Sequence, residues 1–451
     1  MTGERGLGEL RRILGPLAGA AVCVGMAVGA GILRTPGAIA GELPNVGWIF
    51  GVWVLGAVVA TLDALILAEM ASSVPRVGGL VAYLHLSFGR RVAFLIGWSM
   101  LLVTWPASLA AVAVVTGELV AGGADTLGSG APTSPFGLSV AVAVIAALAA
   151  MNLIGLRFGA RVEIGLVLAK VLLLGGVCGA AALAAGGAVS DAPAATASFP
   201  ATTGALLAAV GGAMVQVIFT YDGYADAVYM AGETRDPGRA LPRALFASLL
   251  TITGLYLLAN ASFVWVLGVD GLAQSKFPAL DVAGAAFGEA GGVVLTVVAV
   301  VIMLGALNAY FLTGPRIARV LAEEGLALPF LGRVPESGAP VGATLWIAAL
   351  AIVFATTNSF GQLLDVTVPI ISVTVSLVAI GLLVQRRRAP ERPRPFRTPA
   401  AGVVVGLQVA LGLFLLLSYS YSNPHAVAID AGAFAVGLVV YEVVRRRRAV
   451  T

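Results

Sequence analysis

The chain has 451 residues, of which 59 % are hydrophobic and only 11 % are charged, and its mean hydropathy is +0.98. Soluble domains carry roughly a quarter of their residues as charges, so this composition excludes a water-soluble globular protein and indicates a membrane protein. The net charge of +4 comes from arginines between apolar segments, and these need no nucleic acid to explain them.

About twelve apolar runs follow one another, each long enough to cross a ~30 Å hydrocarbon layer as a helix. Lipid offers the backbone no hydrogen-bond partner, so the runs are expected to be helical. The predicted spans are 13–40, 46–71, 91–121, 137–155, 161–187, 204–232, 242–267, 291–321, 341–356, 362–384, 401–421 and 425–444. The first run is too long and too interrupted for a cleaved signal peptide. The sequence therefore predicts an all-α integral membrane protein.

The first predicted span interrupts its own helix. The stretch "VGMAVGAGILRTPGAIAG" begins as an apolar helix. Gly29 and Gly31 then loosen the backbone, Arg34 adds a charge and Pro36 disfavours continued helix. A weak point at this depth indicates either a binding site or small residues that let two helices pack closely.

The second and fifth predicted spans each carry an ionisable residue at depth. Lys170 lies in the middle of "GLVLAKVLLLGG", where an unpaired lysine costs about 2.5–3.5 kcal/mol. It is either a structural partner or a functional group. Asp63 is a candidate proton carrier or a hydrogen-bonded structural carboxylate. Glu69, Glu118 and Glu163 fall near span ends and are expected at the membrane interface.

Between spans 2 and 3, the segment "GGLVAYLHLSFGRR" is amphipathic and too short to cross the membrane. It is expected to lie along the inner interface or to dip into it as a re-entrant helix.

The sixth predicted span carries a second interruption. In "MVQVIFTYDGYADAVYMAGE", Asp222 and Gly223 stand in the middle of an apolar helix. Asp222 either favours cationic substrates or caps the freed helix end. The two broken spans are five apart, which is the pattern of a transporter built from two inverted five-helix repeats. The two breaks are then expected to meet near the middle of the membrane.

A broken helix exposes N–H groups at one new end and carbonyl groups at the other. A zwitterionic amino acid carries the complementary charges. Its carboxylate is expected on the N–H groups of Gly29, Ala30 and Gly31, and its ammonium at the carbonyls of Ala27, Phe219 and Asp222. Glycine leaves those backbone groups uncovered.

Basic residues alternate along the chain with the predicted spans. If the N-terminus is cytoplasmic, all but three of the 27 Lys and Arg residues fall on the cytoplasmic side, the exceptions being Arg34, Lys170 and Lys276. This is the positive-inside pattern. It predicts a multi-pass protein of the plasma membrane with both termini in the cytoplasm.

The basic linker "QRRRAPERPRPFRTPAAG" divides the chain. Residues 1–384 are expected to form a ten-helix transport core with a short cytoplasmic arm, and residues 385–451 the linker, two further helices and a basic tail. The loops "GGADTLGSGAPTSPFG" and "GGAVSDAPAATASFP" are expected on the outer side of the membrane.

Cys23 and Cys178 are expected to be packing residues, and the two histidines lie too far apart to indicate a metal site.

Four stretches resemble the amino acid–polyamine–organocation (APC) superfamily, and within it the bacterial relatives of the L-type amino acid transporters. They are "GAGILRTPG", "AEMASSVPRVGGLVAYL", "FTYDGYADAVYMAGETRDPGRALPRAL" and "GPRIARVLAEEGLALPFLGRVPESGAP". The resemblance covers residues 13–384 and implies the leucine-transporter fold, a 5+5 inverted repeat with helices 1 and 6 broken, and two peripheral helices. It also implies amino acid transport by alternating access. Ala30 departs from the family's usual serine and removes a hydroxyl.

The resemblance also implies roles for individual residues. Lys170 aligns with the family's fifth-span lysine, which stands where sodium-coupled relatives bind Na⁺, so the resemblance implies sodium independence. Lys170 and, from its own position at depth, Asp63 are the coupling candidates. Phe219 occupies the position of the family's gate. The implied substrate site comprises Ala27, Gly29, Ala30, Gly31, Ile32, Phe219, Tyr221, Asp222, Gly223 and Tyr224.

The sequence therefore predicts a sodium-independent carrier of amino acids, chiefly neutral L-amino acids, working as an exchanger or a proton symporter. The alternative is a polyamine or organic-amine carrier of the same fold. No repeated filter motif favours a channel, and no catalytic set, metal cluster or cofactor motif favours an enzyme. The expected partners are the amino acid, the lipid bilayer and protons, without a cofactor or a disulfide-linked accessory subunit. Asn308, at depth in the eighth span, is expected to bond either a neighbouring helix or the substrate.

Overall fold

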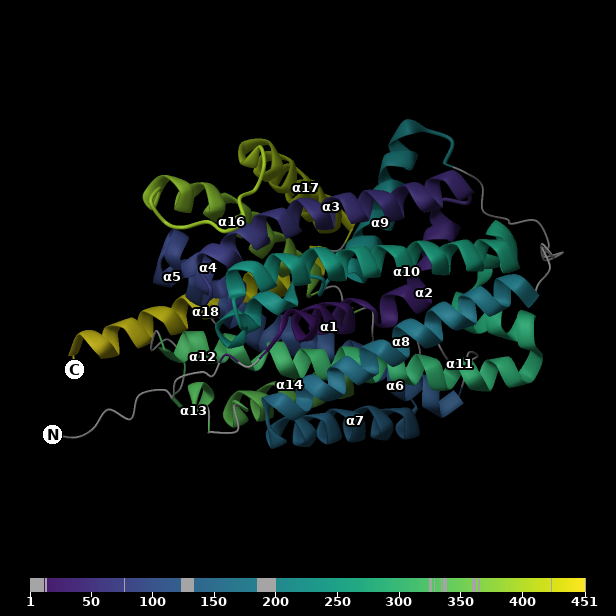
Figure 1. The fold of residues 1–451 in the computed structure, drawn as a ribbon, viewed down its shortest axis with the longest axis horizontal. Helices are drawn as coiled ribbons and strands as arrows, with labels where there is room; N and C mark the ends of the chain where they lie inside the picture. Colours follow the sequence, from purple (N-terminus) through teal and green to yellow (C-terminus); the bar gives the residue numbers. More distant parts are fainter. Residues whose placement is uncertain are drawn as a thin grey trace.

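The computed structural model describes residues 12, 14–76, 78–122, 134–184, 200–323, 327, 329–333, 335, 339–358, 362–363, 366–422 and 424–450. Throughout this part the chain is helical and has no strand, and a single β-bridge joins Leu14 to Thr234. Most helices run roughly along one direction and form a bundle (Figure 1). Both outer loops expected from the sequence fall mostly outside the described residues, as do Arg5 and Arg11.

The first half of the bundle contains α1 (Pro16–Ala27), α2 (Ala30–Glu42), α3 (Val46–Ser73), α4 (Gly79–Phe88), α5 (Arg90–Ser99), the π-helix η1 (Met100–Thr104), α6 (Trp105–Gly122), α7 (Pro135–Ile154) and α8 (Leu156–Ala184). The second half contains α9 (Thr203–Tyr221), the 3₁₀ helix η3 (Asp226–Glu233), α10 (Pro237–Gln274), α11 (Pro278–Thr313), α12 (Pro315–Glu323), α13 (Pro329–Gly332), α14 (Val341–Thr357), α16 (Val368–Arg388), α17 (Ala401–Ser422) and α18 (Pro424–Val450).

Eight helices in the described residues are long and apolar enough to cross a membrane, and the bent pair α1–α2 raises the number to nine. The shorter apolar helices include α4 and α14. Each of the predicted apolar runs coincides with a helix or a helix pair. The chain is therefore a multi-pass helical membrane protein, and the crossing of all twelve runs stays a prediction.

Local sequence signals explain many of the helix ends. The side chains of Asn45, Ser134 and Thr202 each accept a hydrogen bond from a backbone N–H in the first turn of the helix that follows. Gly268 and Gly288 interrupt α10 and α11 with φ angles of +68° and +64°. These interruptions lie where the sequence predicted the seventh span to end and the eighth to begin.

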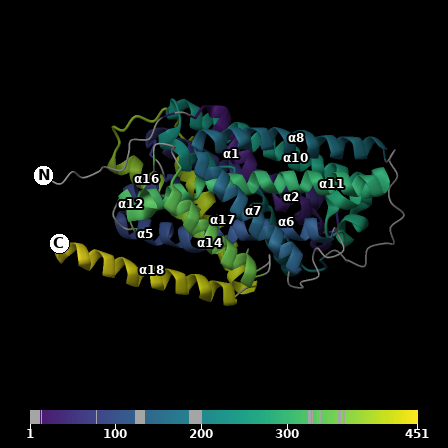
Figure 2. The ribbon, with the colours of Figure 1, turned by 90° about the horizontal axis from the view of Figure 1, so that it is seen from below.

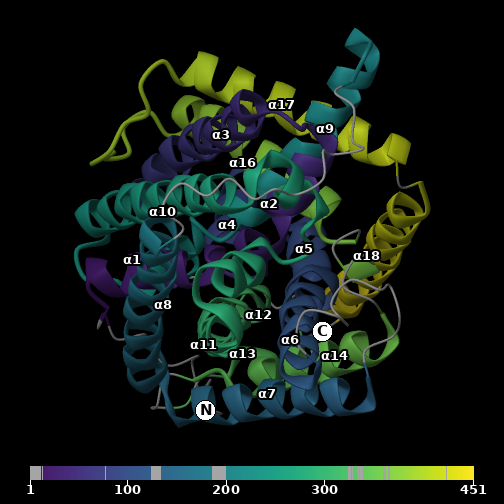
Figure 3. The same cartoon turned by 90° about the vertical axis from the view of Figure 1, so that its right-hand side faces the viewer.

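The broken helices occupy the interior of the bundle. α1 packs against α8, α10 and α11, while α2 packs against α9 and α10. α18 lies along one edge of the bundle (Figure 2), and in the other turned view both α7 and α18 lie at its periphery (Figure 3). α4, expected at the membrane interface or re-entrant, has most of its residues buried and packs against α5, α16 and η3.

Glu69 was expected at the membrane interface. It is fully buried and forms ion pairs with Arg386 at 2.6 Å and Arg394 at 3.3 Å. The backbone N–H of Thr398 also donates to this carboxylate, at 2.7 Å. The sequence did not predict this burial because the partners lie more than 300 residues away. The basic linker is thereby attached to the end of α3.

Candidate functional site

The first break separates α1 from α2 at Val28 and Gly29, and the two helix axes are bent by 44°. Gly29 has non-helical backbone angles, φ −136° and ψ −142°. No side chain caps the first N–H groups of α2. The N-terminal end of α2 therefore offers uncapped donors to an anionic group.

Lys170 occupies the carbonyl side of this break. The side chain is fully buried, and its Nζ donates to the carbonyl oxygens of Gly25 at 2.9 Å and Val28 at 2.8 Å. A methyl group on Gly305 would come within 2.7 Å of Lys170 Cε and Nζ. The ammonium is thus enclosed by protein and neutralises the partial negative charge at the end of α1.

Glu163 and Asn308 extend this polar network. Glu163 was expected at the membrane interface. It is fully buried in the protein on α8, seven residues before Lys170, and it attracts the Lys170 ammonium electrostatically. Asn308 donates to Glu163 Oε2 at 2.6 Å and accepts from Asn152 at 2.8 Å. Asn308 therefore bonds neighbouring helices, which was one of its two expected roles. The sequence did not predict the burial of Glu163 because its hydrogen-bond partner, Asn308, comes from α11 and lies 145 residues away.

The second break follows α9. The Asp222 N–H caps the helix by donating to the carbonyls of Ile218 and Phe219, at 2.9 and 3.1 Å. Gly223 has a φ of +98°, which side-chain-bearing residues rarely adopt. The chain continues as η3, a 3₁₀ helix that begins at Asp226. Asp and Gly in an apolar helix thus produce the interruption that the sequence indicated.

The two breaks lie directly against each other. A methyl group on Gly223 would come within 2.3 Å of Met26 Cγ, and one on Gly31 within 2.6 Å of Thr220 Oγ1. The Tyr256 hydroxyl lies 2.7 Å from the carbonyl oxygens of both Ala27 and Thr220. A hydroxyl has one proton, so it donates to one of these carbonyls at a time.

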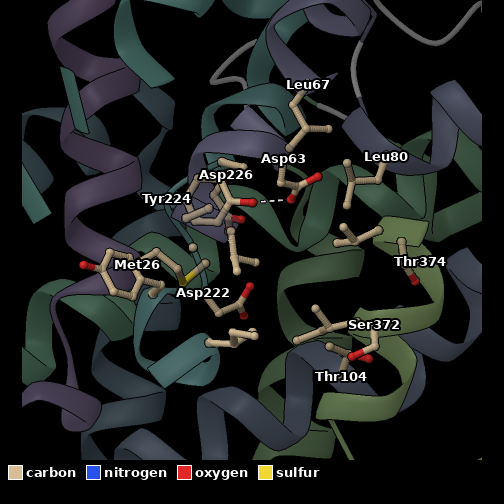
Figure 4. Close-up of a pocket in the computed structure, with 18 of the residues that line it drawn as sticks. Met26, Asp63, Leu67, Leu80, Thr104, Asp222, Tyr224, Asp226, Ser372 and Thr374 are labelled. Carbon is tan, nitrogen blue, oxygen red and sulfur yellow. Dashed lines mark hydrogen bonds between the residues drawn. The ribbon is translucent and has the colours of Figure 1, made fainter. Parts of the chain in front are cut away.

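A cavity of about 100 Å³ opens beside the second break. Its walls come from α3, α4, η1, α6, α9, η3, α11, α16 and α17 (Figure 4). Tyr221, Asp222, Gly223, Tyr224 and Asp63 line it, as does Met26 at the end of α1. The structure therefore brings Asp63 together with four of the residues expected to bind substrate.

Other predicted site residues lie beside the cavity and do not line it. Ala27, Gly29, Ala30, Gly31 and Ile32 form the tightly packed first break, and Ile32 is fully buried. Phe219, the expected gate, is half-buried on α9 and is not among the described lining residues. Lys170, on α8, is also absent from the cavity lining and packs against Gly25 of α1 and Gly305 of α11.

The sequence analysis overlooked Asp226 as a lining residue. Its carboxylate is 8 % exposed and accepts a hydrogen bond from Thr313 Oγ1 at 3.4 Å. The signal was present in "YDGYADAV", where Asp226 stands four residues after Asp222. Contributions from η1, α16 and α17 had no such signal, because only the fold brings those segments to the break.

Acidic groups dominate the electrostatics of the cavity. Asp63, Asp222 and Asp226 all line it, and its described lining contains no Lys or Arg. The Tyr224 hydroxyl donates a short hydrogen bond to Asp63 Oδ2. Asp63 Oδ1 is buried without a hydrogen-bond partner. These carboxylates can bind a positively charged group or protons.

The site is packed shut on one side of the breaks and continues as a cavity on the other side. Beyond the breaks, Thr220 donates to Thr35 at 3.1 Å, Gln216 donates to Glu42 at 3.4 Å, and the Arg34 guanidinium lies 5.9 Å from the centre of the Phe277 ring. In the other direction the cavity continues past Asp63 to Leu67 and to Leu80 of α4.

Comparison with known proteins decides the family. The sequence profile described as "Amino acid permease" matches residues 14–437. The chain belongs to the amino acid permease family. The permease is 26 % identical over 448 residues to the serine/threonine exchanger SteT of Bacillus subtilis (strain 168), a match that covers 98 % of each chain.

Two animal transporters resemble the permease over most of its length. The human b(0,+)-type amino acid transporter 1 is 27 % identical over 420 residues, covering 92 % of the permease and 84 % of the relative. The rat large neutral amino acids transporter small subunit 2 is 25 % identical over 442 residues, covering 96 % and 80 %. The family and these relatives are transporters and not enzymes.

Proposed function

We propose that this permease is a secondary transporter of amino acids that works by alternating access, as an exchanger or a proton symporter. The observation that carries the proposal is the meeting of two helix breaks beside a cavity, with uncapped N–H groups at α2 and free space at Asp222. The amino acid permease profile and the names of the relatives support the substrate class.

The substrate carboxylate binds the N–H groups at the start of α2, and its ammonium binds near the freed end of α9 and Asp222. Ala27, Gly29, Ala30, Gly31 and Ile32 supply the first break in this proposal, and Phe219, Tyr221, Asp222, Gly223 and Tyr224 supply the second. Phe219 acts as the gate. Because Phe219 does not line the cavity in the present conformation, that role requires α9 to move during the cycle.

Sodium independence is the second part of the proposal. Two hydrogen bonds already hold the Lys170 ammonium on the carbonyls of Gly25 and Val28. A sodium ion at the same carbonyls would meet the fixed charge of Lys170. The lysine therefore replaces the cation, and Lys170 and Asp63 are the groups through which transport couples to protons or to counter-substrate.

The architecture proposed for this function has twelve transmembrane helices, with two inverted repeats of five in residues 1–384 and two further helices in 385–451. Both termini are cytoplasmic and the membrane is the plasma membrane. The arginines around α4 and in the linker support that orientation. The cavity then opens toward the cytoplasm.

We further propose that the permease works without a disulfide-linked accessory subunit. The chain has two cysteines, Cys23 and Cys178, and both are buried. Cys23 Sγ accepts a hydrogen bond from the Ala227 N–H at 3.3 Å, so it contributes to packing between α1 and η3. Neither thiol is at a surface where a partner chain can reach it.

A polyamine or organic-amine carrier is the second candidate. The observation in its favour is the three carboxylates of the cavity. Uptake into proteoliposomes separates the candidates: a saturable flux of neutral L-amino acids that is not inhibited by diamines supports the amino acid carrier. A flux of diamines without any amino acid flux would reject the amino acid carrier.

A further inference from the structure

One carboxylate oxygen in the cavity has no partner. Asp63 is 4 % exposed, and its Oδ1 atom makes no hydrogen bond with the described residues. Its other oxygen accepts the Tyr224 hydroxyl. A buried, unpaired carboxylate oxygen costs free energy unless a donor or a cation reaches it. A purely structural carboxylate would be expected to have both oxygens satisfied.

The space next to Asp63 carries only acidic charge. Asp222 and Asp226 line the same cavity, and the Tyr224 hydroxyl lies within electrostatic reach of all three carboxylates. The buried ammonium of Lys170 does not line the cavity and is hydrogen-bonded to the carbonyl oxygens of Gly25 and Val28. A positively charged group of the ligand would therefore pair with carboxylates for which the described lining contains no Lys or Arg.

Asp63 stands apart from the groups proposed to hold the backbone of an amino acid. It comes from α3, whereas the two breaks come from α1–α2 and α9–η3. Tyr224 follows Gly223 directly and reaches Asp63 with its hydroxyl. The Tyr224 side chain thus connects the second break to the Asp63 carboxylate, and both residues line the cavity (Figure 4). A basic side chain held at the break is expected to reach the same carboxylate.

We propose that Asp63, assisted by Asp226, forms a subsite for a second positive group of the ligand, the terminal ammonium or guanidinium of a basic side chain. The inference rests on the proposed function, because it takes the α-ammonium and α-carboxylate to be held at the breaks. A neutral amino acid fills the backbone site and leaves the subsite empty. A basic amino acid fills both.

Ligand pairs that differ only in the distal charge test the subsite. Competition for uptake in proteoliposomes compares lysine with norleucine, which lacks only the ε-ammonium, and arginine with citrulline, which is uncharged. Cadaverine, which is lysine without its carboxylate, separates a basic amino acid from a diamine. We expect the charged member of each pair to compete at least ~10-fold better, and cadaverine to compete less well than lysine.

Three variants assign the preference to Asp63. Asp63→Asn keeps an acceptor for the Tyr224 hydroxyl and removes the charge. Because Asp63 is also a proposed coupling group, the quantity compared is the ratio of lysine to norleucine affinity in a binding measurement, and this ratio should fall by ~10-fold or more. Tyr224→Phe removes the hydroxyl and keeps the charge, so the lysine preference should remain. Asp270→Asn, at a carboxylate of α10 outside the cavity lining, is the matched control and should behave like the parent.

The outcomes are distinguishable. Equal affinity of the parent for lysine and norleucine would overturn the subsite and leave the amino acid carrier intact. An unchanged lysine preference in Asp63→Asn would do the same, even if the pH dependence of uptake were lost. Cadaverine competing as well as lysine would reject the basic amino acid in favour of a diamine. Failure of every amino acid to be carried would reject the proposed function itself.

Discussion

The two helix breaks differ in whether the backbone groups that they free already have partners in the protein. At the first, the protein supplies its own cation: Lys170 binds the carbonyls of Gly25 and Val28, and Gly31 packs directly on Thr220. At the second, free space remains, and Asp222 and Gly223 face a cavity. The first break is filled on its carbonyl side, and the second is left open to a ligand.

This contrast shows that a broken helix is not by itself a binding site. What matters is whether the freed backbone groups already have partners. The carbonyl groups of the first break are taken by Lys170 and by the Tyr256 hydroxyl. The N–H groups of α2 have no side-chain cap. We therefore expect the first break to hold the substrate through its donors alone.

The largest expected effect comes from closing the contact between the breaks. In Gly31→Val, the added side chain would meet Thr220 Oγ1, since even a methyl group would lie 2.6 Å away. It would also cover the N–H groups of α2. Amino acid binding and uptake should fall by at least ~10-fold, measured on protein shown to insert normally. Gly51→Val is the control, because nothing lies within 4 Å of its added carbon. Normal uptake by Gly31→Val would remove the first break from the site.

A second change tests movement at the other break. Phe219→Ala should leave weak binding and remove most transport, because the ligand is no longer enclosed before the carrier turns over. Binding by thermal stabilisation and uptake in proteoliposomes measure the two effects separately. The control is Phe136→Ala, at an exposed phenylalanine of α7. Uptake at the parent rate would reduce Phe219 to a packing residue.

The smallest effect is expected at the edge of the Lys170 network. Glu163→Gln keeps an acceptor for Asn308, whose amide now bonds Glu163 Oε2, and removes the charge that attracts Lys170. We expect the free energy of unfolding to fall by about 1 kcal/mol and uptake to persist. Thermal unfolding and uptake provide the comparison. A complete loss of uptake in folded protein would mean that the Glu163 charge itself takes part in coupling.

The sequence predicted the positions of the helices and of both breaks because these depend on local signals. Apolar runs are continuous, and Gly29, Gly31 and Asp222–Gly223 interrupt them within a few residues. Even the interruptions at Gly268 and Gly288 matched the expected span ends. These features require no knowledge of distant contacts.

The sequence did not predict which polar groups would be buried together. Glu69 and Glu163 each stand near the end of an apolar run, and nothing local indicates that they are buried against partners 317 and 145 residues away. Asp226 was missed, and the walls from α16 and α17 had no motif. Such pairings depend on how helices pack, and a single sequence without tertiary contacts does not specify it.

The most direct test of the account is amino acid uptake with sodium replaced by choline or potassium, in the parent and in Lys170→Ala. The parent should be unaffected, because the Lys170 ammonium already occupies the carbonyls of the first break. Lys170→Ala should be strongly impaired, since each buried carbonyl left unpaired costs about 1–3 kcal/mol. Stimulation of the parent by sodium, with Lys170→Ala behaving like the parent, would contradict the claim that this lysine takes the place of the cation.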